Sequence, residues 1–400
     1  MPDNRLKVAI IVGEDSGDQL GAGLIDAIRA RDRGAQFIGV AGERMIARGM
    51  TSFFPVADVS VMGFSAVLAR LPKILRHIRH TVRDIVLARP DILVIIDSPG
   101  FTHSVAERVA RRLPDLPIVN YVSPQVWAWK PGRARRMARI MQHVLALLPF
   151  EPAVHQRLGG PPCTYVGHPL IERLADLRPG PDERPPLSGE PTLLVLPGSR
   201  MSEIGRLMAP FGAAIALLAA DRARDGLAEL KVVLPAIAHL SDEIAERAAT
   251  WPLKPEIVVG EAAKFAALRG AHAALAASGT VTLELALSGV PMVVAYRLEF
   301  LARIGKRFSK APSIVLANLV IGENVVPEFL DNDGSPEVLA RELAPLLGET
   351  DARTRQLAGF SRLDSLMALP GGWTPSRKAA SIVLDLAVGI GEPGADVQIR

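Results

Sequence analysis

The chain has 400 residues, of which 49% are hydrophobic, 22% charged and 5% aromatic, with 46 basic against 42 acidic side chains. This length favours two domains, the few aromatic residues argue against a base-stacking platform for nucleic acid, and the small basic surplus identifies no partner. One cysteine excludes an intramolecular disulfide, and we find neither a signal peptide nor an apolar stretch of the ~18 residues that span a membrane, so we expect a cytoplasmic protein.

The first predicted strand, residues 7–12, runs into a glycine-rich turn, VGEDSGDQLGAGL at residues 12–24. In dinucleotide-binding proteins a glycine-rich turn after the first strand holds a pyrophosphate. Here the turn also carries Glu14, Asp15 and Asp18, which would repel a phosphate. The turn is therefore either a phosphate cradle or a site for something else.

Residues 64–88 form a predicted helix with an apolar stripe and basic residues on its other faces, FSAVLARLPKILRHIRHTVRDIVLA. A basic amphipathic helix can lie on an anionic membrane surface, although most such helices cover a protein core. A second basic and apolar segment occupies residues 296–319. Because no nucleic-acid motif accompanies either segment, a membrane-associated, phosphorylated substrate fits this charge better.

Two loops of the first half carry candidate functional residues. Asp97 follows the buried strand DILVIID and is either a general base or the cap of the helix after it. The loop YVSPQVWAWKPGRARR contains Trp127 and leads into a basic helix. It either contacts a sugar, a phosphate or a membrane, or is a packed loop beside a solvated helix.

The predicted strands are KVAIIV, QFIGV, DILVIID, PIVNYV and HVLALL in the first half and TLLVLP, LKVVLP, EIVVG, AALAA and PMVVAY in the second. Their alternation with helical segments predicts two doubly wound, Rossmann-like α/β domains with parallel sheets, and the two domains face a cleft. A proline-rich stretch at residues 177–191 separates the two series of strands. We predict an N-terminal acceptor-side domain (residues 1–170), a linker (171–190), a C-terminal nucleotide-binding domain (191–375) and a final helix and tail (376–400). Open parallel sheets bind ligands at the carboxyl ends of their strands.

Two strand-end turns of the second half suit an anion. Arg200 ends the turn LPGSR and begins a helix, so a guanidinium lies beside a helix N-terminus, unless the turn is an ordinary one with a surface arginine. Ser278, Gly279 and Thr280 form an acid-free turn that opens the next such helix, with Glu284 one turn in. In one interpretation a diphosphate binds this turn and the ribose hydroxyls bind the Glu284 carboxylate. In the other, these residues only cap the helix. Histidine and cysteine show no metal-ligand spacing, so we predict no metal and no cofactor.

A series of short motifs resembles the lipid-A-disaccharide synthase family, glycosyltransferases of Gram-negative bacteria with the GT-B architecture. In chain order between Val8 and Trp373 these motifs are GEDSGDQLGAGLI, VAGERM, VMGFSAVL, DSPGF, YVSPQVWAWK, LPFEP, YVGHPL, LPGSR, ASGTVTLE, PMVVAYR and VPEFL. The resemblance implies an inverting transfer from UDP-2,3-diacylglucosamine to 2,3-diacylglucosamine 1-phosphate, which gives a β-1′,6-linked disaccharide and UDP without a metal. It also implies a peripheral position on the inner face of the inner membrane and leaves a homo-oligomer open.

The same resemblance assigns roles to residues. Asp97 matches the suspected catalytic base, while Arg200, Ser278, Gly279, Thr280, Glu284 and Asn318 match the UDP-sugar site. We expect Glu14, Ser16, Asp18 and Trp127 on the acceptor side, so the opening turn handles a sugar rather than a dinucleotide. The chain departs from the family pattern at Ala66, Gly100, Thr102, Ala317 and Asp331. These departures bear on how the acceptor is held, and they leave open a non-enzymatic lipid- or nucleotide-binding protein. Two further alternatives are another GT-B UDP-sugar enzyme and a dinucleotide-dependent oxidoreductase.

Overall fold

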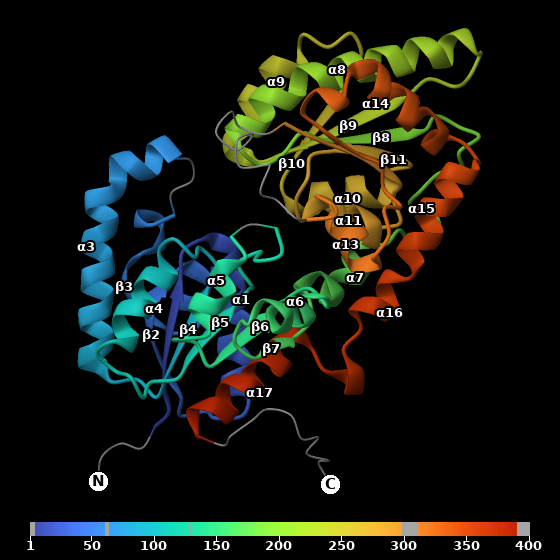
Figure 1. Cartoon of the computed structure of the whole chain (residues 1–400). Helices are drawn as coiled ribbons and strands as arrows, with labels where there is room; N and C mark the ends of the chain where they lie inside the picture. The colour runs from blue at the N-terminus through green and yellow to red at the C-terminus, as the bar shows by residue number, and fades with distance from the viewer. Residues whose placement is uncertain (1–4, 61–63, 129, 298–310, 390–400) are drawn as a thin grey trace. The chain divides into compact units, whose positions relative to one another are not determined.

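The computed structural model of the chain describes residues 5–60, 64–128, 130–297 and 311–389, with the backbone alone for residues 64–69. The chain folds into two compact units (Figure 1). Unit 1 comprises residues 1–169 together with 369–400, and unit 2 comprises residues 170–368. The segment 171–190, predicted as a linker, lies in unit 2, where the Arg184 guanidinium donates to the carbonyl oxygens of Arg269, Ser288 and Gly289.

Unit 1 is built on a seven-stranded parallel sheet in the order β3-β2-β1-β4-β5-β6-β7. Its strands are β1 Lys7–Val12, β2 Gln36–Ala41, β3 Thr51–Pro55, β4 Ile92–Ile96, β5 Ile118–Tyr121, β6 His143–Ala146 and β7 Cys163–Tyr165. Its helices are α1 Asp15–Arg29, α2 Glu43–Ile46, α3 Phe64–Ala88, α4 Thr102–Ala110, α5 Gly132–Met137, α6 Glu151–Leu158 and α17 Pro375–Ala387.

Unit 2 repeats this arrangement with a six-stranded parallel sheet in the order β10-β9-β8-β11-β12-β13. Its strands are β8 Thr192–Leu196, β9 Lys231–Ala236, β10 Glu256–Val259, β11 Ala273–Ala276, β12 Met292–Tyr296 and β13 Glu328–Leu330. Its helices are α7 Leu174–Leu177, α8 Met201–Arg224, α9 Ser241–Ala248, α10 Glu261–Gly270, α11 Val281–Leu287, α13 Leu316–Ile321, α14 Pro336–Leu343, α15 Asp351–Ser361 and α16 Leu363–Met367. These two sheets confirm the predicted pair of parallel α/β domains.

Both faces of the unit 1 sheet are buried, which explains its continuous apolar strands. Val8 and Ile10 of β1 pack with α1, α2 and α17, whereas Ala9 and Ile11 pack on the other face with α3 and α4. The final helix α17 lies beside α1 (Figure 1) and fully buries Ala379 and Val383. Helix α17 therefore completes the first unit's core.

Helix α8 is the one helix in the described part of the chain whose length and composition would allow it to cross a membrane. In the structure, 56% of its most apolar 18-residue window is buried. Ile204, Leu207 and Phe211 of this helix pack against β8 and β9 in the unit 2 core. We therefore assign its apolar face to the core of the unit.

The sequence prediction missed the edge strands β3, β7 and β13. Each has only three to five residues, and none of these residues is fully buried. An edge strand lacks a neighbour on one side, so it needs no continuous apolar run. The strands that the sequence did predict lie further inside the two sheets, apart from β10 at one edge.

Four histidines are held neutral inside unit 1. Burial lowers the pKa of four imidazoles to about 4, those of His103, His143, His155 and His168. The unfolded chain takes up these protons near pH 6.5, before the folded chain does, so the stability is present above pH 6.5 and is lost as pH falls toward 4. Burial raises the pKa of Glu151 to about 7, so this group alone stabilises the folded state as pH falls below 7. Its effect is opposite to that of the four histidines and smaller than their sum.

We predict that acid unfolds unit 1 before unit 2. Protonation at pH 4 lowers the free energy of unfolding of unit 1 by on the order of 3 kcal/mol for each histidine. Hydrogen exchange followed by mass spectrometry at pH 7, 6, 5 and 4 will show protection lost first from β1, β4 and β5. His143→Gln should shift the loss to lower pH, whereas His239→Gln, an exposed histidine of unit 2, should leave it unchanged. Loss of protection in unit 2 first would contradict the prediction.

Candidate functional site

The carboxyl ends of β1 and β4 bring Ser16 and Asp97 together in unit 1. The strand order reverses between β1 and β4, and such a switch point is where open parallel sheets bind ligands. The Ser16 hydroxyl donates to Asp97 Oδ2 over 2.8 Å, and the Ser98 amide donates to Asp97 Oδ1 over 2.8 Å. Asp97 is half-buried and Ser16 is exposed, so the carboxylate is oriented and remains accessible from solvent.

The backbone that carries Asp97 is strained. Asp97 and Ser98 have φ values of +58° and +41°, in the left-handed region that costs a non-glycine residue of order 1 kcal/mol. The Thr102 hydroxyl stabilises this turn by donating to the carbonyl oxygen of Asp97 over 2.7 Å. A Cβ at Gly13 would lie 2.3 Å from Ser98 Cβ, so only glycine lets the two loops pack this closely.

Other members of the predicted acceptor side have different surroundings. Glu14 is half-buried at the N-cap of α1. Asp18, expected to meet sugar hydroxyls, is 1% exposed, and its carboxylate accepts from the amides of Gly42, Arg44 and Met45 over 2.8, 2.9 and 3.2 Å. These bonds cap α2, so Asp18 joins α1 to α2, and its expected contact with sugar hydroxyls stays a prediction that this geometry does not favour.

Trp127 is half-buried and is held by helix α6. Its ring packs edge-on against Phe150, and its Nε1 donates to Glu151 Oε1 over 3.4 Å. The Leu148 amide donates to the other oxygen of Glu151, and Ser123 bonds to His155 over 2.9 Å. The sequence prediction overlooked Glu151 and His155, although the motif LPFEP places the glutamate at the start of α6, after the loop that follows β6. The structure thus favours the packed loop, which still leaves part of the tryptophan exposed.

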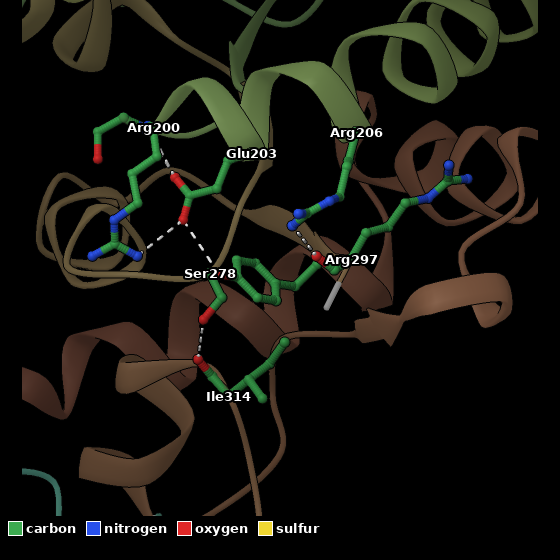
Figure 2. A network of polar contacts seen from close by, with 8 residues as sticks. Arg200, Glu203, Arg206, Ser278, Arg297 and Ile314 are labelled. Carbon is green, nitrogen blue, oxygen red and sulfur yellow. Dashed lines mark hydrogen bonds and ion pairs between the residues drawn. The ribbon is translucent and has the colours of Figure 1, made fainter. Parts of the chain in front are cut away.

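In unit 2 the corresponding switch point lies between β8 and β11. Arg200 is the N-cap of α8, and its guanidinium side chain is 54% exposed. Figure 2 shows the Glu203 carboxylate against this turn, where it accepts from the amides of Ser199 and Arg200. The two amides that lead into α8 therefore donate to Glu203, and the exposed Arg200 guanidinium remains accessible to an outside anion.

The turn at residues 278–280 has an open surface. The Ser278 hydroxyl donates to the Ile314 carbonyl oxygen over 2.6 Å, which holds the turn to the segment before α13 (Figure 2). Gly279 has φ +151°, no heavy atom of the described residues lies within 4 Å of where its Cβ would be, and Thr280 is exposed. The Thr280 side chain caps nothing, so the capping role that the sequence left open is absent for it.

Two further arginines lie near this switch point and were missed by sequence reasoning. Arg206 is on the second turn of α8, and Arg297 follows β12. The Arg206 Nη1 atom donates to the Arg297 carbonyl oxygen over 3.4 Å (Figure 2). The end of the motif PMVVAYR was the available signal for Arg297. With Arg200 they make this edge of the sheet cationic.

Glu284 and Asn318 are engaged within unit 2. Glu284 forms an ion pair with Lys264 of α10, with 2.5 Å between Nζ and Oε2. Asn318 is 2% exposed, and its amide exchanges two hydrogen bonds with the Val326 backbone, over 3.0 and 2.9 Å. Asn318 therefore closes the loop between α13 and β13. Its predicted contact with the UDP-sugar stays a prediction that this geometry does not favour.

Within the described ranges there is no group of three or more histidine, cysteine, aspartate or glutamate side chains placed to hold a metal ion. The accessible charged groups singled out at the two switch points are the Asp97 carboxylate in unit 1 and the Arg200 guanidinium in unit 2. The first can accept a proton, and the second can bind an anion.

Residues 8–367 match the family model described as lipid-A-disaccharide synthetase. The chain is 53% identical over 385 residues to the lipid-A-disaccharide synthase of Bradyrhizobium diazoefficiens, covering 96% of this chain and 97% of that protein. It is 39% identical over 386 residues to the synthase of the same name from Rhodospirillum centenum, covering 95% and 94%.

Solved structures with the same fold have little sequence identity. The Staphylococcus aureus MnaA–UDP structure aligns with a TM-score of 0.61 and 13% identity over 96% of this chain and 97% of that chain. The Acinetobacter baumannii MurG structure aligns with a TM-score of 0.55 and 15% identity over 95% and 99%. These similarities concern the fold alone, and they agree with the expected GT-B architecture.

We predict that Asn318→Ala lowers the free energy of unfolding of unit 2 by about 1–3 kcal/mol, because it leaves the Val326 amide and carbonyl unpaired in the interior. Urea denaturation followed by hydrogen exchange in α13 and β13 measures the loss. Asn324→Ala, an exposed residue of the same loop, is the matched control and should change nothing. An unchanged stability of Asn318→Ala would mean that these bonds do not hold the loop.

Proposed function

The chain belongs to the lipid-A-disaccharide synthase family, and we propose that it transfers the diacylglucosamine unit of UDP-2,3-diacylglucosamine to the 6-hydroxyl of 2,3-diacylglucosamine 1-phosphate. The products are the β-1′,6-linked disaccharide 1-phosphate and UDP, with inversion at the anomeric carbon. The observation that carries this proposal is the family match over residues 8–367, which spans both switch points with their charged side chains. The chain is a glycosyltransferase that acts on a sugar nucleotide and a lipid phosphate.

On the donor side, we assign the diphosphate to the cationic edge of unit 2. The exposed Arg200 guanidinium can donate to a phosphate in a bidentate manner, and the open turn at residues 278–280 can add backbone amides. Glu284 is the group for the ribose hydroxyls, in exchange for its ion pair with Lys264. Stabilising the leaving diphosphate lowers the barrier because its negative charge grows in the transition state.

On the acceptor side, Asp97 takes the proton from the attacking 6-hydroxyl. Its carboxylate is already oriented by Ser16 and by the Ser98 amide, so little ordering is left to do when substrate binds. The new glycosidic bond forms as the bond to the diphosphate breaks, and the proton passes to the Asp97 carboxylate. A positioned general base contributes about 10²- to 10⁴-fold to the rate.

The reaction itself is the first test. Purified protein incubated with both lipid substrates, with and without EDTA, should form disaccharide and UDP in equal amounts under both conditions. UDP released without the acceptor would indicate another UDP-sugar enzyme. Absence of product under both conditions, with UDP still bound, would indicate a binding protein and contradict the proposal.

In the same assay, Asp97→Asn should lower kcat by about 10²- to 10⁴-fold, because an amide cannot take the proton. UDP affinity, measured by calorimetry, should stay at the wild-type value. Asp115→Asn, an exposed aspartate before β5 at the opposite ends of the strands, is the matched control and should keep full activity. Near-wild-type turnover of Asp97→Asn would remove Asp97 from the mechanism.

The position of the protein at the inner face of the inner membrane is also part of the proposal, and helix α3 supports it. Its second half packs in the core through Ile78, Val82 and Ile85. Its first half exposes Leu71 and Leu75, by 40% and 38%, beside the exposed Arg70, Lys73 and Arg76. Exposed apolar and basic side chains on the same half of a helix suit an anionic lipid interface. The other basic segment, residues 298–310, lies outside the described residues.

We predict that Arg70→Glu/Arg76→Glu weakens binding to vesicles rich in phosphatidylglycerol at least ~10-fold, since each basic residue near such a surface contributes ~1 kcal/mol. Vesicle flotation at 50 and 300 mM salt measures binding. The control, Arg83→Glu/Arg89→Glu, makes the same change in charge toward the other end of α3 and should bind as the wild type does. Equal loss in both variants would mean that net charge, not this surface, governs binding.

A further inference from the structure

Glu203 is a buried carboxylate at the first turn of α8 that sequence reasoning did not assign to the site. Its side chain is 8% exposed. Oε2 accepts from the Ser199 and Arg200 amides over 3.0 and 3.3 Å. Oε1 accepts from Arg200 Nη1 over 3.4 Å and from the Tyr296 hydroxyl over 3.3 Å. The carboxylate therefore joins the β8–α8 turn to the end of β12.

The turn is shaped around this carboxylate. Gly198 has φ +112°, and a Cβ there would lie 2.4 Å from Glu203 Oε2. A larger residue would displace either the turn or the carboxylate. Glu203 is the N3 residue of α8, and its carboxylate accepts from the amide of the N-cap residue Arg200, which is one of the two bonds of a capping box. The second bond would need an acceptor on the N-cap side chain, and a guanidinium has only donors.

Glu203 touches Arg200 without using up its donors. A guanidinium has five N–H donors in a rigid plane, and the contact with Oε1 involves one nitrogen of an otherwise exposed group. Figure 2 shows the Arg200 side chain extending past the carboxylate, with Ser278 below the same network. The remaining donors face outward, where an anion can reach them.

We propose that Glu203 is a positioning residue for the nucleotide diphosphate: it fixes the direction of the Arg200 guanidinium and, through Tyr296, couples that direction to the end of β12. This inference rests on the proposed function, because it takes the anion at Arg200 to be the diphosphate of UDP. Glu203 acts through Arg200 and does not touch the ligand.

Two opposite effects follow from the same charge. Glu203 repels a nearby diphosphate, yet it also orders the arginine that binds it. The repulsion is reduced because the carboxylate lies at the positive end of α8 and is bonded to two amides and a guanidinium. Orientation is therefore the larger effect, and removal of the charge weakens binding.

Glu203→Gln tests this at the level of atoms. The glutamine oxygen can replace Oε2 on the two amides, which leaves its NH₂ group facing Arg200 Nη1, donor against donor. We expect the Kd of UDP, measured by calorimetry on the full chain, to rise about fivefold, as for loss of one ion pair. The KM for the UDP-sugar should rise similarly, with the KM for the lipid acceptor unchanged. Tyr296→Phe, which keeps the charge, should raise the Kd about twofold.

A double-mutant cycle separates positioning from general structure. Arg200→Ala should weaken UDP binding by at least ~10-fold, and Glu203→Gln added to Arg200→Ala should weaken it no further. Glu243→Gln, which breaks the half-buried ion pair with Arg247 on α9, is the matched control and should leave UDP binding unchanged. Where Glu203→Gln folds poorly, Tyr296→Phe and its cycle with Arg200→Ala give the same answer.

The outcomes are distinct. A wild-type chain that does not bind UDP overturns the proposed function. A wild-type chain that binds UDP while Glu203→Gln binds it equally well or more tightly overturns the positioning role alone. A lower melting temperature with unchanged UDP affinity, or an equal effect of Glu203→Gln with and without Arg200, also assigns Glu203 to the fold and not to the site.

Discussion

Parallel pairing of the strands is the constraint on which both candidate sites depend. In a parallel sheet all carboxyl ends lie at one edge, so loops far apart in the sequence become neighbours there. The pairing of Val12 with Ile96 brings Ser16 to Asp97, and the pairing of Leu196 with Ala276 brings Arg200 near the turn at residues 278–280. Neither site would exist without that register. Each unit thus supplies one type of chemistry from the same geometry, a carboxylate in the first and guanidinium groups in the second.

Buried carboxylates hold the loops that carry these groups. Asp18 bonds to the amides before and within α2, Glu151 to the Leu148 amide and Trp127, and Glu203 to the β8–α8 turn. Each replaces water around backbone donors that a loop at the end of a sheet leaves unpaired. The side chains expected to meet ligands, Ser16, Arg200 and Thr280, are the exposed ones beside them. A buried acid and an exposed polar side chain therefore lie within three residues of each other at the starts of α1 (Asp18 and Ser16) and α8 (Glu203 and Arg200).

The sequence allowed the two parallel sheets to be predicted because strands such as Val8–Val12 are buried on both faces and are apolar throughout. It also predicted that Asp97, Arg200 and the 278–280 turn lie at the carboxyl ends of such strands, as the structure shows. The short, half-buried edge strands gave no comparable signal. Asp18 could not be distinguished from Ser16, because its partners are amides 24 to 27 residues away. Glu203 looked like an ordinary helix residue, and only the three-dimensional contact with Tyr296 revealed its connection to β12.

Unit 1 is made of two separate segments of the chain, and this affects how the protein folds during its synthesis on the ribosome. Residues 170–368 form unit 2, and α17, which follows them, supplies Ala379 and Val383 to the core of unit 1. At roughly 5–20 residues per second, synthesis of the intervening unit delays α17 by about ten seconds or more. During that time the apolar side of α1 lacks the helix α17 that covers it in the finished protein, whereas the residues of unit 2 follow one another without interruption in the chain. Unit 1 is therefore the first unit to be translated and the last to be completed, and its uncovered apolar surface is where a ribosome-associated chaperone would bind.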